Sequence, residues 1–153
     1  MTEARKTSLH PISETLLNAY RFLVRQEGIS FEVGAKNIQS LDSIVKTVHS
    51  SYFGLERYPK PAQKAAAYFY YIIKNHPMVD GNKRLAVLWL QLITASQFQP
   101  IPLFNEKTGQ QTTPDELAIA VEASIEDHDA IIQLLSKLFE SVEYVALPAA
   151  SIF

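Results

Sequence analysis

The side chains best suited to chemistry in this sequence are gathered in nine consecutive residues, 76–84, which read His-Pro-Met-Val-Asp-Gly-Asn-Lys-Arg. A histidine titrates near neutral pH and can act as a general base. A carboxylate beside phosphates suits Mg²⁺, and Lys and Arg bind phosphate as a mobile point charge and as a bidentate donor. Phosphoryl transfer needs mainly positioning, charge neutralisation and a base, so these residue types favour that reaction class.

The order of the residues adds a second argument, because Gly81 and Asn82 predict the start of a helix directly after Asp80. A helix start offers free N–H groups and the positive end of a dipole, and a glycine there lets an anion approach the backbone. Lys83 and Arg84 would lie in the first turn, where the dipole disfavours cations. A bound polyanion explains the two adjacent cations better than helix stability does. Asn82 could hydrogen-bond either a phosphate or the loop.

His76 is predicted to end the preceding helix, because Pro77 disfavours helical geometry in the residue before it. It continues the apolar stripe of that helix, so we expect a partly exposed ring. There it could take a proton from a hydroxyl that attacks a bound phosphate. Taken singly, His76 would be a capping or packing residue and Asp80 a simple N-cap. Only their combination within nine residues favours a site.

The composition narrows the function further. The chain has 153 residues, no cysteine and a formal net charge of −2. A disulfide scaffold, a thiolate metal site and a cysteine nucleophile are therefore excluded, and the lack of a basic excess argues against direct nucleic-acid binding. The N-terminus is polar, and the most apolar stretch, 85–95, is about half as long as a bilayer span. We expect a soluble, cytoplasmic protein without a membrane partner.

Helical periodicity marks six stretches, and none shows sustained alternation of apolar and polar residues, so the predicted fold class is all-α. Ser13 is the predicted N-cap of the first helix and Gly28 its stop, and Thr113 with Glu116 forms a capping box before the fifth. Nine of the eleven residues in 85–95 are apolar, which predicts a central helix covered on several sides. The six helices are expected at about 13–26, 41–50, 61 to the break at 76–77, 82 through 95, 114–125 and 127–140.

These helices are assigned to one domain, 13–140, flanked by an N-terminal arm, 1–12, and a C-terminal tail, 141–153. Residues 29–34 are short, partly β-branched and end in glycine, which indicates a small β-hairpin or an extended flap. The glycine and prolines of 51–61 predict a loop, and 97–111 is expected to be a long connection.

Residues 76–84 resemble the signature of the Fic/Doc superfamily, which runs His-Pro-Phe-x-Asp/Glu-Gly-Asn-Gly/Lys-Arg. The resemblance continues upstream through Tyr58-Pro59 and Lys64-Ala65-Ala66 to Lys74-Asn75, and more weakly over most of 13–139. It implies a Fic-like helical fold, ATP as co-substrate and Mg²⁺ as cofactor. The implied site residues are His76 as general base, Asp80 as the Mg²⁺ ligand, and Gly81, Asn82, Lys83 and Arg84 as the phosphate-binding turn. The family's flap, which docks the target chain, would fall on Ile29, Ser30, Phe31, Glu32 and Val33.

Three departures from the signature bear on the reaction. Met78 replaces the usual Phe, Lys83 stands where AMP-transferring members have Gly, and Val87 stands where they have a second Arg. Lys83 and Val87 resemble the residues found at these positions in the death-on-curing (Doc) branch. That branch transfers the terminal phosphate of ATP to a threonine of elongation factor Tu, and its members are toxins controlled by a separate antitoxin protein. The alternatives are a Fic-type adenylyltransferase that modifies a Ser, Thr or Tyr hydroxyl, and a non-catalytic module that binds a nucleotide or a partner.

Overall fold

The computed structural model describes residues 9–28, 33–94, 103–104 and 111–144, and these form six helices and two short hairpins. The all-α class with about six helices is therefore confirmed. The helices are α1 (Pro11–Glu27), α2 (Ala35–Val48), α3 (Pro61–Asn75), α4 (Asn82–Ile93), α5 (Pro114–Ala123) and α6 (His128–Phe139). The hairpins pair β1 (Ser51–Tyr52) with β2 (Leu55–Glu56) and β3 (Leu103–Phe104) with β4 (Gln111–Thr112), both antiparallel.

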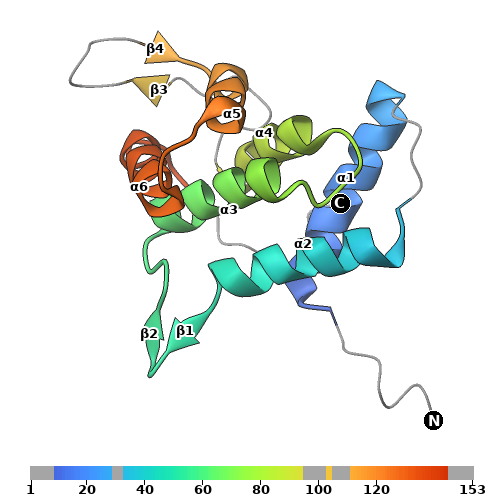
Figure 1. Ribbon diagram of the computed structural model, residues 1–153, viewed down its shortest axis with the longest axis horizontal. Coiled ribbons are helices and arrows are strands. Elements are labelled where there is room, and N and C mark those ends of the chain that lie inside the picture. The colour runs from blue at the N-terminus through green and yellow to red at the C-terminus, as the bar shows by residue number, and fades with distance from the viewer. Residues whose placement is uncertain (1–8, 29–32, 95–102, 105–110, 145–153) are drawn as a thin grey trace.

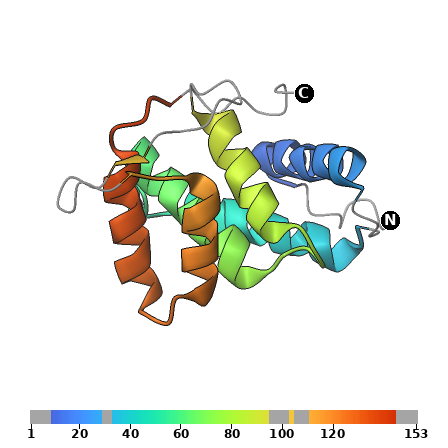
Figure 2. The ribbon, with the colours of Figure 1, turned by 90° about the horizontal axis from the view of Figure 1, so that it is seen from above.

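The centre of the domain is the pair α3 and α4. α3 contacts α2, α4, α5 and α6, whereas α4 contacts α1, α3 and α5. Figure 1 shows α1 and α2 on one side of this pair and α5 and α6 on the other, and Figure 2 shows the same layers from above. The turn that joins the two central helices is segment 76–81, so the candidate site lies between the best-packed elements of the fold.

α4 has neighbours on several sides, as its composition predicts. Every residue from Leu85 to Leu90 is buried, and Trp89 is only 1% exposed. A helix with one covered face needs an apolar stripe, whereas a helix enclosed by three others is apolar nearly all round. The start of α4 is thus fixed in place by the packing of these buried residues in the core.

The first two helices begin earlier than predicted. α1 starts at Pro11 with His10 as N-cap, whose Nδ1 accepts from the Ile12 amide at 3.1 Å. Ser13 is therefore not the cap; it is buried in the first turn, while Gly28 does end the helix in the left-handed region. α2 starts at Ala35 rather than at Leu41. The prediction missed its first turns because they are mostly polar and carry little hydrophobic periodicity.

The hairpins lie where loops were expected. Segment 51–61 holds β1 and β2, joined by Phe53 and Gly54 with φ of 53° and 79°. Positive φ at both central residues gives the twist that suits a two-residue hairpin turn. Of the predicted flap, Ile29–Glu32 lie outside the described residues, and Val33 is half-buried against the core.

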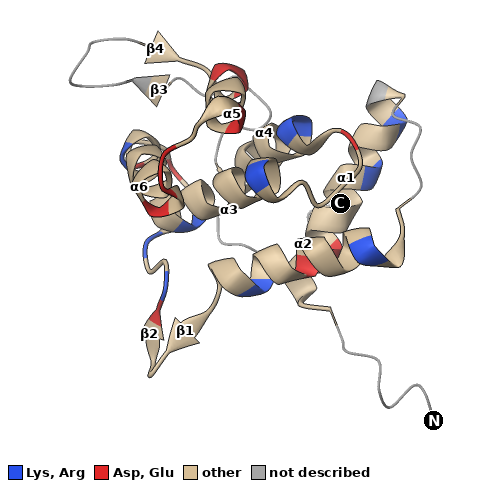
Figure 3. Ribbon diagram, in the orientation of Figure 1, with Lys and Arg blue, Asp and Glu red and all other residues tan. Residues whose placement is uncertain are grey.

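Charged residues are distributed over the whole fold. Figure 3 shows Lys and Arg along several helices rather than gathered on one. In the portion of the chain described here, no helix has both the length and the apolar character needed to cross a bilayer.

Asp42 on α2 ties α2 to the start of α1. Its Oδ1 accepts from Ser13 Oγ at 2.7 Å and from the His10 amide at 3.0 Å, and its Oδ2 lies 2.8 Å from Lys46 Nζ. Burial acts to raise the pKa of Asp42, but the hydrogen bonds from Lys46, Ser13 and His10 outweigh it and hold the pKa below its ordinary value of 3.8. The ionised carboxylate therefore stabilises the fold above that pH, and the contribution is lost as the pH falls through the lowered pKa.

Asp42→Ala is expected to lower the free energy of unfolding by about 2–3 kcal/mol, because buried Ser13 loses its acceptor along with the other two contacts. Urea unfolding at pH 7 measures the loss, and the gap to wild type should shrink as the pH is lowered below 3.8. Glu126→Ala, which removes an exposed carboxylate, is the control. Equal losses in both variants would contradict this role of Asp42.

Candidate functional site

The turn between α3 and α4 begins with an unusual backbone conformation. His76 caps α3 in the left-handed region, with φ 47° and ψ 59°, and Pro77 follows it. Such a conformation costs a residue other than glycine about 1–3 kcal/mol and needs support from its surroundings. The side chain of His76 is 59% exposed, more than its place on the apolar stripe predicted, because the chain leaves the helix at this residue.

The support comes from the carboxamide of Asn82, the first residue of α4. Its Oδ1 accepts from the Met78 amide at 3.0 Å and its Nδ2 donates to the Met78 carbonyl at 2.8 Å. Asn82 is 4% exposed and Met78 3% exposed, so these bonds are buried and close the turn from inside. Of the two partners predicted for Asn82, phosphate or loop, the structure places it on the loop.

The same carboxamide favours one tautomer of a neutral His76 ring. Because Met78 uses both ends of the amide, the nitrogen end must face the ring, and Nδ2 lies 3.3 Å from His76 Nδ1. An amide NH₂ can only donate, so this contact requires Nδ1 to accept. The neutral ring then carries its proton on Nε2, the nitrogen that faces the pocket.

Two residues that sequence reasoning missed hold the outside of the turn. Asn37 of α2 donates from Nδ2 to the Pro77 carbonyl at 2.9 Å, and Tyr20 of α1 donates from its hydroxyl to the Asp80 carbonyl at 2.8 Å. Burial, and then the nearby charge of Asp80, raise the pKa of Tyr20, so this hydroxyl keeps its proton. Both contacts join positions at least 40 residues apart, and no local pattern marks them.

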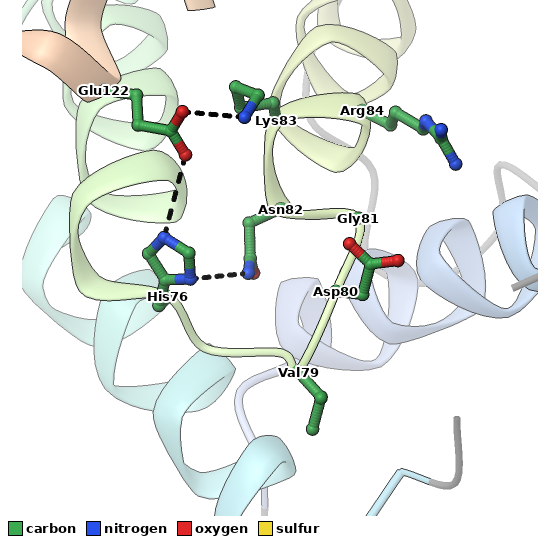
Figure 4. A pocket seen from close by; sticks show the side chains of 8 residues that line it. All are labelled: His76, Val79, Asp80, Gly81, Asn82, Lys83, Arg84 and Glu122. Carbon is green, nitrogen blue, oxygen red and sulfur yellow. Dashed lines mark hydrogen bonds and ion pairs between the residues drawn. The ribbon is translucent and has the colours of Figure 1, made fainter. Parts of the chain in front are cut away.

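All six motif residues proposed for the site border one open pocket of about 240 Å³. Figure 4 shows Glu122 and His76 at one side of it, Asp80 and Arg84 at the other, and Asn82 between them. The full lining is His76, Val79, Asp80, Gly81, Asn82, Lys83, Arg84 and Glu122. The predicted flap residue Val33 does not line this pocket.

The Asp80 side of the pocket combines a free carboxylate with a helix start. Gly81, not Asp80, is the N-cap of α4, with φ 81°, and no side chain caps the helix. The Asp80 carboxylate and the Arg84 guanidinium have no hydrogen-bond or ion-pair partner among the residues that the structure describes. Both groups, and the first amides of α4, are therefore available to a ligand.

The His76 side of the pocket contains a residue that sequence reasoning did not identify as part of the site. Glu122 of α5 places Oε1 2.8 Å from Lys83 Nζ and Oε2 3.9 Å from His76 Nε2. The hydrogen bond from Lys83 is the main cause of a lowered pKa at Glu122. Lys83 was expected to await an external anion, but in this structure it already has a counterion. The unfavourable position of Lys83 in the first turn of α4 predicted an anionic partner but did not identify it.

Comparison with known proteins identifies the family of this chain. The family model described as "Fic/DOC family" matches residues 9–94, which is more than half of the chain. The chain therefore belongs to the Fic/DOC family. It is also 36% identical over 55 residues to a protein named Toxin Doc from Mycolicibacterium smegmatis, an alignment that spans 36% of this chain and 42% of that relative. No solved structure matches.

Asn82→Ala is expected to lower the free energy of unfolding by about 2–3 kcal/mol, because it leaves the buried Met78 amide and carbonyl without partners. Urea unfolding measures this, and hydrogen exchange of the Met78 amide should accelerate. Val79→Ala, at an exposed position of the same turn, is the matched control and should stay within about 0.5 kcal/mol. Unchanged exchange at Met78 in Asn82→Ala would refute the role of Asn82.

Proposed function

We propose that this protein is a Doc-like kinase that transfers the terminal phosphate of ATP to a hydroxyl of a target protein. One observation carries the proposal: an imidazole, two cations and an uncapped helix start meet in a single pocket. Positioning and charge neutralisation account for most of the catalysis of phosphoryl transfer, and these groups supply both beside a candidate base. The relative named Toxin Doc supports the same branch.

The reaction forms a bond between the target oxygen and the γ-phosphorus and breaks the bond from that phosphorus to the β–γ bridging oxygen, releasing ADP. The hydroxyl proton passes to His76 Nε2. To accept it there, the ring must hold its other proton on Nδ1, which gives up the 3.3 Å contact with Asn82. Because Nδ1–H and the Asn82 amide group would then both be donors, the ring must also turn away from Asn82. Leaving a buried donor unpaired costs about 1–3 kcal/mol, small beside the barriers that enzymes lower.

Arg84 and the amides at the start of α4 would bind the phosphate oxygens, and Asp80 would hold Mg²⁺. The fit for the metal rests on the exposed carboxylate of Asp80, which has no partner among the described residues. A bound Mg²⁺ usually keeps one or two carboxylates with phosphate oxygens and water, and it neutralises developing charge on the phosphates. Asp80 orients the nucleotide in this scheme, and Gly81 leaves room for it.

The choice of phosphate over AMP rests on two positions. Lys83 extends an ammonium to the His76 side of the pocket, where AMP-transferring members have a glycine. Val87, where those members have a second arginine, is 9% exposed and belongs to the core. A polyphosphate would thus find its cations at positions 83 and 84, which favours the terminal phosphorus near His76. The proposed target is elongation factor Tu, and the proposed regulator is a separate antitoxin protein.

Wild-type protein incubated with Mg²⁺, elongation factor Tu and ATP labelled at either the α or the γ phosphate should transfer only the γ label. His76→Ala should abolish the transfer, whereas His128→Ala, at an exposed histidine outside the pocket, should retain it. Transfer of the α label would instead identify AMP transfer. Nucleotide binding without transfer of either label would identify a binding module.

Arg84→Met should weaken ATP binding about tenfold or more, because it removes a charged hydrogen-bond donor to phosphate. Calorimetric titration with ATP and Mg²⁺ measures the change. Arg57→Met removes an equal charge beside Tyr58, outside the pocket, and should leave the affinity unchanged. The same affinity in wild type and Arg84→Met would rule out this phosphate site.

A further inference from the structure

Helix α5 reaches the motif through a contact with the end of α3. Lys74 Nζ donates to the Ser124 carbonyl at 2.8 Å and to the Glu122 carbonyl at 3.4 Å. Carbonyls at the end of a helix lack partners within it and carry partial negative charge, so a lysine there satisfies and stabilises them. The end of α5 is thereby fixed beside His76, two residues after Lys74 in the chain.

This anchor brings the Glu122 carboxylate over the pocket. One oxygen pairs with Lys83 Nζ at 2.8 Å and the other faces His76 Nε2 at 3.9 Å. Figure 4 shows Glu122 above His76, with the Lys83 side chain turned toward it and the Arg84 side chain turned away. The two adjacent cations of the motif thus point to opposite sides of the pocket.

Without Glu122 nothing in the described contacts would hold the Lys83 ammonium on the His76 side. The positive start of α4 and the neighbouring Arg84 both repel it. The long, flexible side chain of Lys83 would then sample many positions in water, so its ammonium would not stay beside any one phosphate oxygen. The Glu122 carboxylate therefore fixes the position of the Lys83 ammonium.

We propose that Glu122 is a positioning residue, which holds the Lys83 ammonium next to the phosphate that is transferred to the hydroxyl activated by His76. The inference rests on the proposed kinase function and adds a residue to it. An ammonium has three N–H donors, and Glu122 occupies one, which leaves two for phosphate oxygens. The carboxylate is 42% exposed, so water screens its repulsion of the phosphates.

Kinetics of phosphate transfer to elongation factor Tu test the proposal in Glu122→Gln, Lys83→Met and the double variant. Glu122→Gln should lower kcat about tenfold or more and leave KM for ATP within about twofold, because placement matters most in the transition state. The double variant should be no slower than Lys83→Met, since Glu122 acts through Lys83. Glu126→Gln removes an equal charge from the turn after α5 and should behave as wild type.

An unchanged kcat, a lower KM or a faster enzyme in Glu122→Gln would overturn the proposal, because the carboxylate would then be idle or merely compete with phosphate. Multiplicative losses in the double variant would also overturn it. These results differ from failure of the kinase function itself, in which the wild-type protein transfers no γ label.

A titration that does not depend on transfer separates the two cases further. Carbon-13 NMR of the Glu122 carboxyl should find a lowered pKa in the free protein, caused mainly by the Lys83 hydrogen bond. With a non-hydrolysable ATP analogue and Mg²⁺ bound, the pKa should remain low, because the pair persists. A return to the ordinary value on binding would mean that phosphate displaces Glu122, which contradicts a positioning role.

Discussion

The buried carboxamide of Asn82 is the constraint on which the rest of the site depends. With its two ends bonded to one backbone unit, at Met78, it closes the turn between the central helices and faces its nitrogen toward His76. The left-handed backbone of His76 lies at one end of this turn and the uncapped start of α4 at the other, so the bonds of Asn82 lie between them. Core residues of α4 then keep the turn in place, because the helix that carries Asn82 is packed against three others.

The electrostatics of the site follow from where α4 begins. A helix start, Lys83 and Arg84 place positive potential in a small volume, and such an arrangement is unfavourable in an empty site. Glu122 offsets the charge on one side, while the exposed Asp80 lies on the other. The pocket is therefore close to balanced before any ligand arrives, yet keeps a guanidinium and backbone amides exposed to anions.

Much of this arrangement could be predicted from the sequence, and the reasons differ between residues. The break after Asn75 and the helix start at Asn82 depend on Pro77 and Gly81, whose backbone preferences act locally. The starts of α1 and α2 were missed, because Asp42 and Asn37 stabilise them through contacts that no periodicity records. Glu122 was missed for the same reason, since it meets Lys83 across 39 positions of the chain. The flap lies outside the described residues and stays a prediction.

One wall of the pocket has a separate origin along the chain. The family match ends at residue 94, whereas Glu122 belongs to α5, almost thirty positions later. The motif and this side of the pocket are thus contributed by separate segments of the chain. Divergence in the later segment can retune charge around an unaltered signature, so two homologues sharing every motif letter need not share catalytic behaviour. Exchanging α5 between relatives would test whether specificity depends on this helix rather than on the signature.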